Sequence, residues 1–177
     1  MPMFNLAFKC EPLGSGDEAI REEMVADLAA EALFGESSEL YLRLYEQGLI
    51  DTSFGGGCET FDGCAMLLCS GDSDDARAVR NAILDQAEKI IREGVNEQDF
   101  LRMKRSALGR RIRGLDSFDG TCFRVCAYHF SQFDYFRCPE VYRQSTAEEI
   151  RSFLKRVVTP ERCCLSIIEP IAGCGEN

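Results

Sequence analysis

Alternation of large apolar residues with small or polar ones predicts that the chain begins with a β-strand. Phe4, Leu6 and Phe8 would share one face of an extended segment. Three further short segments, each rich in apolar residues, are also predicted to be extended: 49–54, 61–70 and 162–169. The segment 61–70 is apolar on both of its faces, which is typical of a central strand covered on both sides. The segment 55–60 before it is either a hairpin connection or a continuation of the strand pair.

Between these segments, apolar residues recur at every third or fourth position, which predicts six helices. Local signals give a helix ending near Phe34, one from Ser37-Ser38 to Gly48, one ended by Gly94, one begun by Asn96, one over 117–133 and one begun by Ser145 or Thr146. Ser15 with Glu18, and Asn96 with Asp99, have the spacing of capping boxes. The order β-α-α-β-β-α-α-α-α-β predicts an α+β fold. We expect a mostly antiparallel sheet of about four to six strands with helices packed on one face.

Composition narrows the class of protein. The chain has 177 residues, of which 45% are hydrophobic and 28% charged, as expected of one globular domain. We expect this domain to span residues 1–172 and residues 173–177 to form a disordered tail. No signal peptide precedes the first strand, which predicts a cytoplasmic protein. A fold that begins within a strand suggests that the chain is cut from a longer one.

The net charge of −10 argues against nucleic acids and anionic membranes as partners, because both attract clustered cations. Most of the cations that do cluster lie on one predicted helix: Arg102, Lys104, Arg105, Arg110, Arg111 and Arg113. We interpret them as a solvated helix face near acidic neighbours rather than as a binding patch, because no aromatic residues are interleaved with them.

The ten cysteines are a high number for a chain of this length. Because no signal peptide is visible, we expect reduced thiols that pack in the core as small apolar residues, rather than disulfides. Cys122, Cys126 and His129 follow at i, i+4 and i+7 on one helix face, a spacing that could present metal ligands. A fourth ligand is lacking nearby, so core packing is the favoured interpretation. A cysteine-based metal or redox protein is the least favoured hypothesis for the function.

The stretch 34–57 carries the most specific pattern of the chain. Its defining residues are Phe34-Gly35, Ser37-Ser38, Leu40-Tyr41, Leu44-Tyr45-Glu46, Gly48-Leu49-Ile50-Asp51 and Ser53-Phe54. This pattern resembles the second homologous domain in one half of an insulinase-like (M16, pitrilysin superfamily) zinc peptidase. The similarity is closest to a bacterial branch associated with modification of elongation factor P. Two later stretches, 93–104 and 146–170, are similar to a helix junction and to the closing helix and strand of the same domain.

The resemblance implies that zinc is held elsewhere. Enzymes of this family bind their metal on a helix with the motif His-x-x-Glu-His, whose glutamate acts on the zinc-bound water. This chain has one histidine, His129, and its neighbours do not form the motif. The chain would therefore be a C-terminal, non-catalytic domain with no catalytic residue, metal or cofactor of its own. Zinc is expected in the N-terminal half of the full-length protein.

The resemblance also implies a role for the domain. It would enclose the peptide chamber of a zinc metalloendopeptidase, contact the peptide substrate, and dock on the N-terminal half or on a homologous M16-like subunit. The candidate substrate-contact residues are Arg43, Tyr45, Asp51, Phe54 and Gly55. Many relatives place an arginine and a tyrosine at this junction, whereas the matching positions here hold Tyr45 and either Ile50 or Asp51, so the pair is expected to be absent. The alternative function is therefore an inactive peptidase-like scaffold or assembly module.

Overall fold

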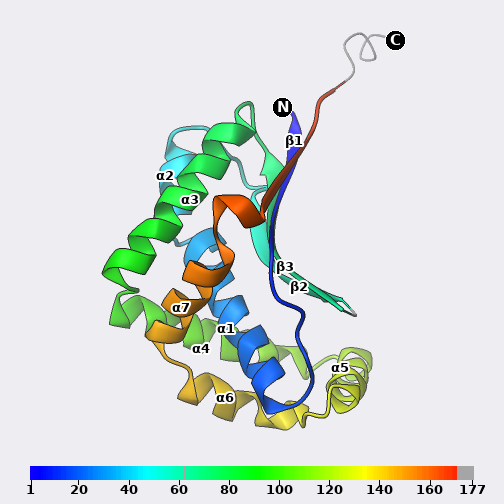
Figure 1. Ribbon diagram of the computed structural model, residues 1–177. Coiled ribbons are helices and arrows are strands. Elements are labelled where there is room, and N and C mark those ends of the chain that lie inside the picture. The colour runs from blue at the N-terminus through cyan, green and yellow to red at the C-terminus, as the bar shows by residue number, and fades with distance from the viewer. Residues whose placement is uncertain (62, 171–177) are drawn as a thin grey trace.

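The computed structural model describes residues 1–61 and 63–170, so the predicted tail over 173–177 lies outside the described residues. Four strands form one sheet: β1 (Met3–Lys9), β2 (Gly55–Phe61), β3 (Cys64–Asp72) and β4 (Cys163–Ile168). Their order across the sheet is β2-β3-β1-β4, and every neighbouring pair is antiparallel. The helices lie to one side of this sheet (Figure 1), which confirms the predicted α+β fold.

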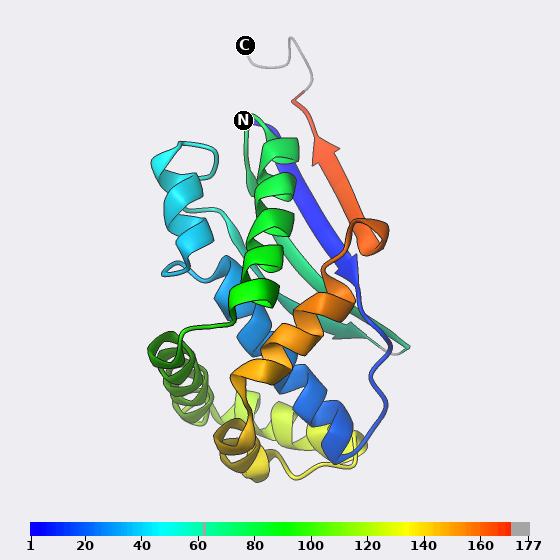
Figure 2. The ribbon, with the colours of Figure 1, turned by 60° about the vertical axis from the view of Figure 1, so that its left-hand side comes forward.

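The helical layer is built around α1. The helices of the described residues are α1 (Asp17–Phe34), α2 (Glu39–Glu46), α3 (Ala76–Glu93), α4 (Glu97–Gly114), α5 (Phe118–Phe130), α6 (Cys138–Gln144) and α7 (Ala147–Val157), with short 3-10 turns η1 (Tyr135–Arg137) and η2 (Pro160–Arg162). α1 contacts β2, α4 and α7, and it lies between α7 and the sheet (Figure 2). Of these helices, only α6 is absent from the predicted set. Pro139 stands in its first turn, where a helix does not need the missing amide.

The helices named above are all too short or too polar to span a lipid bilayer.

The two faces of the sheet differ in burial. Leu6 of β1 pairs with Cys69 of β3, and both side chains are fully buried beneath the helices. Met66 and Leu68 of β3 point to the opposite face and are only half-buried. The expectation that the segment 61–70 is covered on both sides is therefore wrong for the described residues. The strand is central in the sheet, but helices cover only one of its faces.

The segment 49–54 turns instead of forming the expected strand. Gly48, with a φ of 66°, ends α2 in the left-handed conformation, as predicted. The amide of Ser53 then donates to the carboxylate of Asp51 at 2.8 Å, so a side chain satisfies a backbone group that a strand would pair across the sheet. Phe54 packs into the core with 4% exposure, and β2 begins at the next residue.

Two predicted capping boxes are not formed. α1 begins after Gly16 without a side-chain cap, so Ser15 and Glu18 do not form a box. The amide of Gly16 donates instead to the carbonyl of Ser131, just after α5, at 2.7 Å. Asn96 caps α4 alone, whereas Asp99 forms an ion pair within that helix.

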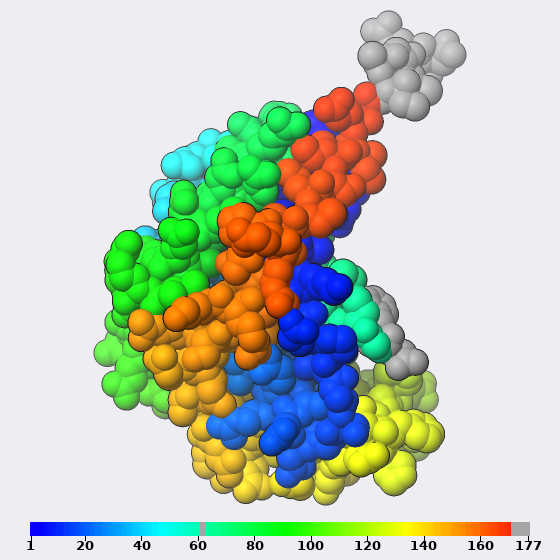
Figure 3. Space-filling model, in the orientation of Figure 1, coloured from blue at the N-terminus to red at the C-terminus, as the bar shows by residue number. Residues whose placement is uncertain are grey.

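α5 departs most from expectation, because none of its residues is buried. Phe118, Phe123 and Phe130 are 75–84% exposed, and Cys122 and Cys126 are exposed as well. The expectation that this helix face packs in the core is therefore wrong. Figure 3 shows α5 (yellow-green) at the margin of the molecule. Periodicity identifies an apolar helix, but it does not say whether another element of the same chain covers it.

Ser38 begins α2, as predicted, and is a buried cap. Its hydroxyl accepts from the amide of Tyr41 at 3.1 Å and donates to the carbonyl of Leu33 at 3.0 Å. We expect Ser38→Ala to lower the free energy of unfolding, measured by urea denaturation, by about 1–2 kcal/mol. Ser37→Ala is the matched control, because the exposed Ser37 bonds Arg102 at the surface; its expected loss is below about 0.5 kcal/mol. Equal losses in the two variants would refute the capping role.

Candidate functional site

A groove of about 790 Å³ follows the outer edge of the sheet. It is bounded by the start of β2, the end of α1 with the loop that follows it, and α4. The lining residues are Asp27, Ala30, Glu31, Phe34, Gly35, Glu36, Ser37, Phe54, Gly55, Gly56, Gly57, Arg102, Ser106 and Arg110. β3 pairs with β2 on one side, and no strand of the described chain pairs with the other. Backbone groups on such an edge are available to another extended chain.

Three successive glycines form the floor of the groove. A Cβ on Gly56 would lie 2.6 Å from the carbonyl oxygen of Leu68 and 2.6 Å from the ring of Phe34, so a side chain has no room there. A Cβ on Gly55 or Gly57 would meet nothing within 4 Å. Gly56 therefore allows α1 to approach the strand closely, and the other two glycines leave the backbone uncovered.

The walls of the groove carry charges of both signs. Arg110 pairs with Glu31 at 3.2 Å, and Arg102 donates to the hydroxyl of Ser37 at 2.5 Å. Asp27 forms an ion pair at 3.2 Å with Arg111, which lies next to the groove. Because these charges are matched within the protein, the groove favours neither a cationic nor an anionic ligand. The part of the groove most open to a ligand is therefore the main chain of β2.

Arg111 links α1, α4, α5 and α6 beside the groove. Its guanidinium donates to the hydroxyls of Tyr142 at 3.0 Å and Tyr128 at 2.9 Å, and to the carboxylate of Asp27 at 3.2 Å. Glu23 lies 3.6 Å from the same group and accepts a bond from the Tyr128 hydroxyl at 2.5 Å. The planar, five-donor guanidinium suits this position, because it hydrogen-bonds three partners and forms an ion pair with a fourth, Glu23.

Burial alters the acid–base behaviour of this cluster. It raises the pKa of Asp27 above its usual range, and the attraction of Arg111 offsets part of that rise. It also raises the pKa of Tyr142 to about 12 and that of Cys138 to about 11. The pKa of Tyr128 is raised by the same cause. The tyrosines and the thiol are therefore neutral near pH 7, and the two tyrosine hydroxyls accept hydrogen bonds from Arg111.

The five predicted contact residues lie in two places. Phe54 and Gly55 line the groove, although the ring of Phe54 is buried. Arg43, Tyr45 and Asp51 are not part of its lining. Tyr45 is 50% exposed and stacks on the neighbouring tyrosine of α2, and Asp51 closes the turn before β2. The contact of any of the five with a substrate stays a prediction.

The sequence did not predict that α4 forms one wall of the groove, with Arg102, Ser106 and Arg110. The cations of this helix were expected to form a solvated face, which holds for the exposed Arg113 but is wrong for Arg111, whose side chain is 18% exposed. A signal was present, because Arg111 continues the buried positions Met103 and Ala107 at steps of four residues. Ser106 gave no such signal.

In the described part of the chain, no three His, Cys, Asp or Glu residues gather as a possible metal site. Cys122, Cys126 and His129 are instead all exposed on α5. The nine described cysteines are free thiols, of which three are buried, three half-buried and three exposed. The buried ones are Cys10, Cys69 and Cys138. The expectation that the thiols pack in the core is therefore correct for only part of the set.

Known proteins share both the sequence pattern and the fold. Residues 1–107 match the family model described as the peptidase M16 inactive domain. The zinc protease YmfH of Bacillus subtilis (strain 168), itself uncharacterized, is 26% identical over 163 residues, which are 90% of this chain and 37% of the relative. A chain assigned as an M16-like peptidase from Alicyclobacillus acidocaldarius superposes with a TM-score of 0.87 at 19% identity, over 96% of this chain and 41% of that one.

A further solved structure is the inactive peptidase domain of a chain assigned as a zinc protease from Bordetella parapertussis. It has a TM-score of 0.79 at 12% identity, and the match covers 96% of this chain and 91% of that one. The chain thus spans less than half of the Bacillus and Alicyclobacillus proteins and nearly all of the Bordetella chain. At these identities the solved structures support the fold alone, whereas the family model matches more than half of the residues. The chain belongs to the family of peptidase M16 inactive domains.

Proposed function

We propose that this domain is the non-catalytic part of an M16-type zinc metallopeptidase and that it holds peptide substrate along the edge of β2. The observation that carries the proposal is the glycine-floored groove beside this outer strand. The domain would close the peptide chamber opposite a zinc-bearing N-terminal half. Membership of the M16 family and the 37% span of the Bacillus relative support such a further half.

An extended peptide would add to the sheet as a fifth strand. Its main-chain amides and carbonyls would pair with those of β2, which gives affinity with little dependence on sequence. Gly55 and Gly57 carry no side chain over this part of the strand, so its main chain is uncovered. Side chains of the peptide would alternate between the groove walls and the helix-free face of the sheet.

Docking of the zinc-bearing half is proposed for α5. Phe118, Phe123 and Phe130 expose three large apolar rings on a helix that has no buried residue. Phe123 and Phe130, seven residues apart, lie on one face of this helix, and exposed apolar surfaces mark interaction sites in soluble domains. A further domain of the same polypeptide is the occupant we favour, because the Bacillus and Alicyclobacillus relatives are more than twice as long as the matched region.

Peptide binding can be tested on the 177-residue chain with a fluorescein-labelled octapeptide of alternating valine and threonine. We expect saturable binding by fluorescence anisotropy. Ser106→Trp fills the groove from α4 and is expected to weaken binding about tenfold or more, since several main-chain hydrogen bonds are lost. A peptide N-methylated at alternate amides is expected to bind at least as poorly.

Ser152→Trp is the matched control, because Ser152 is exposed on α7 and outside the groove. It should bind the octapeptide as the unmodified chain does. Unchanged affinity in Ser106→Trp, or for the N-methylated peptide, would show that the edge of β2 does not hold the peptide.

An inactive scaffold is the second candidate, and the position of Tyr45 and Asp51 outside the groove favours it. Zinc-dependent hydrolysis of a peptide by the full-length protein would show that the domain is part of an active peptidase. A full-length chain that lacks the motif His-x-x-Glu-His would instead support the inactive scaffold. The cytoplasmic location and the link to the elongation factor P branch stay predictions from the sequence.

A further inference from the structure

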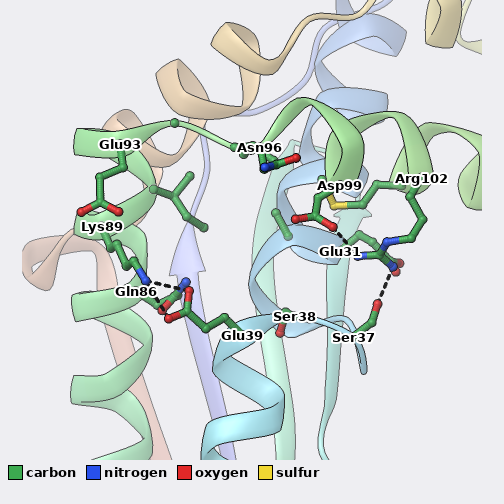
Figure 4. A pocket seen from close by; sticks show the side chains of 15 residues that line it. Glu31, Ser37, Ser38, Glu39, Gln86, Lys89, Glu93, Asn96, Asp99 and Arg102 are labelled. Carbon is green, nitrogen blue, oxygen red and sulfur yellow. Dashed lines mark hydrogen bonds and ion pairs between the residues drawn. The ribbon is translucent and has the colours of Figure 1, made fainter.

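Side chains of a peptide paired with β2 would meet two different surfaces, one on each face of the sheet. On the helix side, both cations that line the groove are already engaged. Arg102 bonds the side chains of Ser37 and Asp99 (Figure 4). Arg110 pairs with Glu31. This side therefore gives an acidic peptide no advantage.

Gly57 is a glycine that the packing of the described residues does not require. Gly56 is explained by packing, because a Cβ there would lie 2.6 Å from the ring of Phe34. A Cβ on Gly57 would meet nothing within 4 Å, and the φ of Gly57 is not positive. Glycine weakens a strand, so a strand glycine without a steric or conformational reason is expected where another molecule approaches the backbone closely.

Gly57 has apolar neighbours on the helix-free face of the sheet. It pairs with Leu68 of β3, which is half-buried on that face, and Leu68 pairs in turn with Ala7 of β1. Gly55 also leaves its part of the strand uncovered, but it pairs with the polar Ser70. Of these two glycines, Gly57 is therefore the one that gives access to an apolar surface.

We propose that the edge of β2 selects peptides with an aromatic residue opposite Gly57, whose ring lies across the glycine and packs on Leu68. Because it requires the peptide to pair with β2, this preference rests on the proposed function. Directly paired residues point to the same face of a sheet, so the aromatic side chain lies on the helix-free face.

The distance to Leu68 favours a ring over a shorter side chain. The peptide strand and β3 are two strand spacings apart, about 9.6 Å. A ring that lies over Gly57 can meet Leu68 across this distance, whereas valine and threonine are too short. Aromatic residues stabilise sheets by covering an edge glycine in this way.

Fluorescence anisotropy with labelled octapeptides tests this preference on the 177-residue chain. The reference peptide alternates threonine and valine, starting with threonine, and a second peptide has phenylalanine in place of the third threonine. If the peptide runs antiparallel along residues 54–61, like every neighbouring pair of this sheet, that position lies opposite Gly57. We expect phenylalanine to tighten binding about fivefold. Leucine at the same position should gain less than about twofold, because it does not span the glycine.

Leu68→Thr removes the apolar partner of the ring and keeps a residue suited to a strand. It should bind the reference peptide as the unmodified chain does and lose the gain from phenylalanine. Gly57→Val fills the space that the ring would occupy, so the gain should be lost there as well. Ile168→Thr is the matched control and should keep the gain, because Ile168 is exposed on the same face of the sheet but on β4, at the opposite edge.

The reference peptide separates the two proposals. If the unmodified chain does not bind it, the proposed function itself is refuted. If the reference binds but phenylalanine brings no gain, or leucine gains as much, the aromatic preference is wrong while the peptide groove stands. The same holds if Leu68→Thr or Gly57→Val keeps the gain. Should Leu68→Thr no longer bind the reference, Gly57→Val decides.

Discussion

Arg111→Met is expected to lower the free energy of unfolding by about 3 kcal/mol, because it leaves partly buried carboxylates without their cation. Asp27 and Glu23 both face this guanidinium, and the hydroxyls of Tyr128 and Tyr142 would lose their donor. Urea denaturation at pH 7, followed by circular dichroism, measures the loss. The effect should exceed that of any ion pair at the surface of this protein, since exposed pairs contribute about 0–1 kcal/mol.

Arg113→Met is the matched control, because Arg113 is exposed two residues further along α4; a change within about 0.5 kcal/mol is expected. Adding Asp27→Asn to Arg111→Met should recover about 1 kcal/mol, since the orphan charge is then removed. A loss below 1 kcal/mol in Arg111→Met, or no recovery in the double variant, would contradict this account.

The deficit of Arg111→Met should also depend on pH. The pKa of Asp27 is already raised by burial and would rise further without the arginine. The folded state would then bind the proton more tightly than the unfolded chain does, so stability is gained as the pH falls through the raised pKa and lost as it rises. The deficit is therefore expected to shrink between pH 7 and pH 4.5.

Gly56→Ala is expected to lower the free energy of unfolding by about 2 kcal/mol, because the new methyl group has no room. Its Cβ would lie 2.6 Å from the carbonyl oxygen of Leu68, 2.6 Å from the ring of Phe34 and 2.8 Å from the Cβ of Cys69. Two of these three neighbours belong to β3, so the strand pair itself would have to shift. Thermal and urea denaturation measure the loss.

Gly57→Ala differs by one position and faces the side of the sheet without helices, where its Cβ meets nothing within 4 Å. Its free energy of unfolding should be unchanged or raised by about 0.4–1 kcal/mol, because alanine restricts the unfolded chain. If the two variants lose equal stability, close packing of α1 on β2 is not the reason for a glycine at position 56.

Much of the fold could be predicted from local patterns. The alternation of Phe4, Leu6 and Phe8 places β1, and the steps of three and four residues from Ile150 to Val157 place α7 with its buried face. Such periodicities are local consequences of strand and helix geometry, so they can be read without knowledge of the neighbours. The segment 49–54 could not be distinguished from a strand, because the bond between Asp51 and the amide of Ser53 competes locally with sheet pairing.

The candidate site was only partly visible in the sequence. Phe54 and Gly55 were expected at it, and both line the groove. The contribution of α4, including Ser106, depends on how this helix packs against α1, which ends far earlier in the sequence.

By itself, the sequence determined most of the helices, the strands β1, β3 and β4, and that His129 stands alone without a zinc motif. The tertiary structure alone decided which apolar surfaces are covered. β1 is buried beneath the helices, whereas the rings of Phe118, Phe123 and Phe130 on α5 stay exposed. The physical reason is that hydrophobicity drives burial without specifying a partner. Contacts between residues that are far apart in the sequence decide which element covers which apolar surface. In this domain they leave uncovered the outer edge of β2 and the phenylalanine rings of α5.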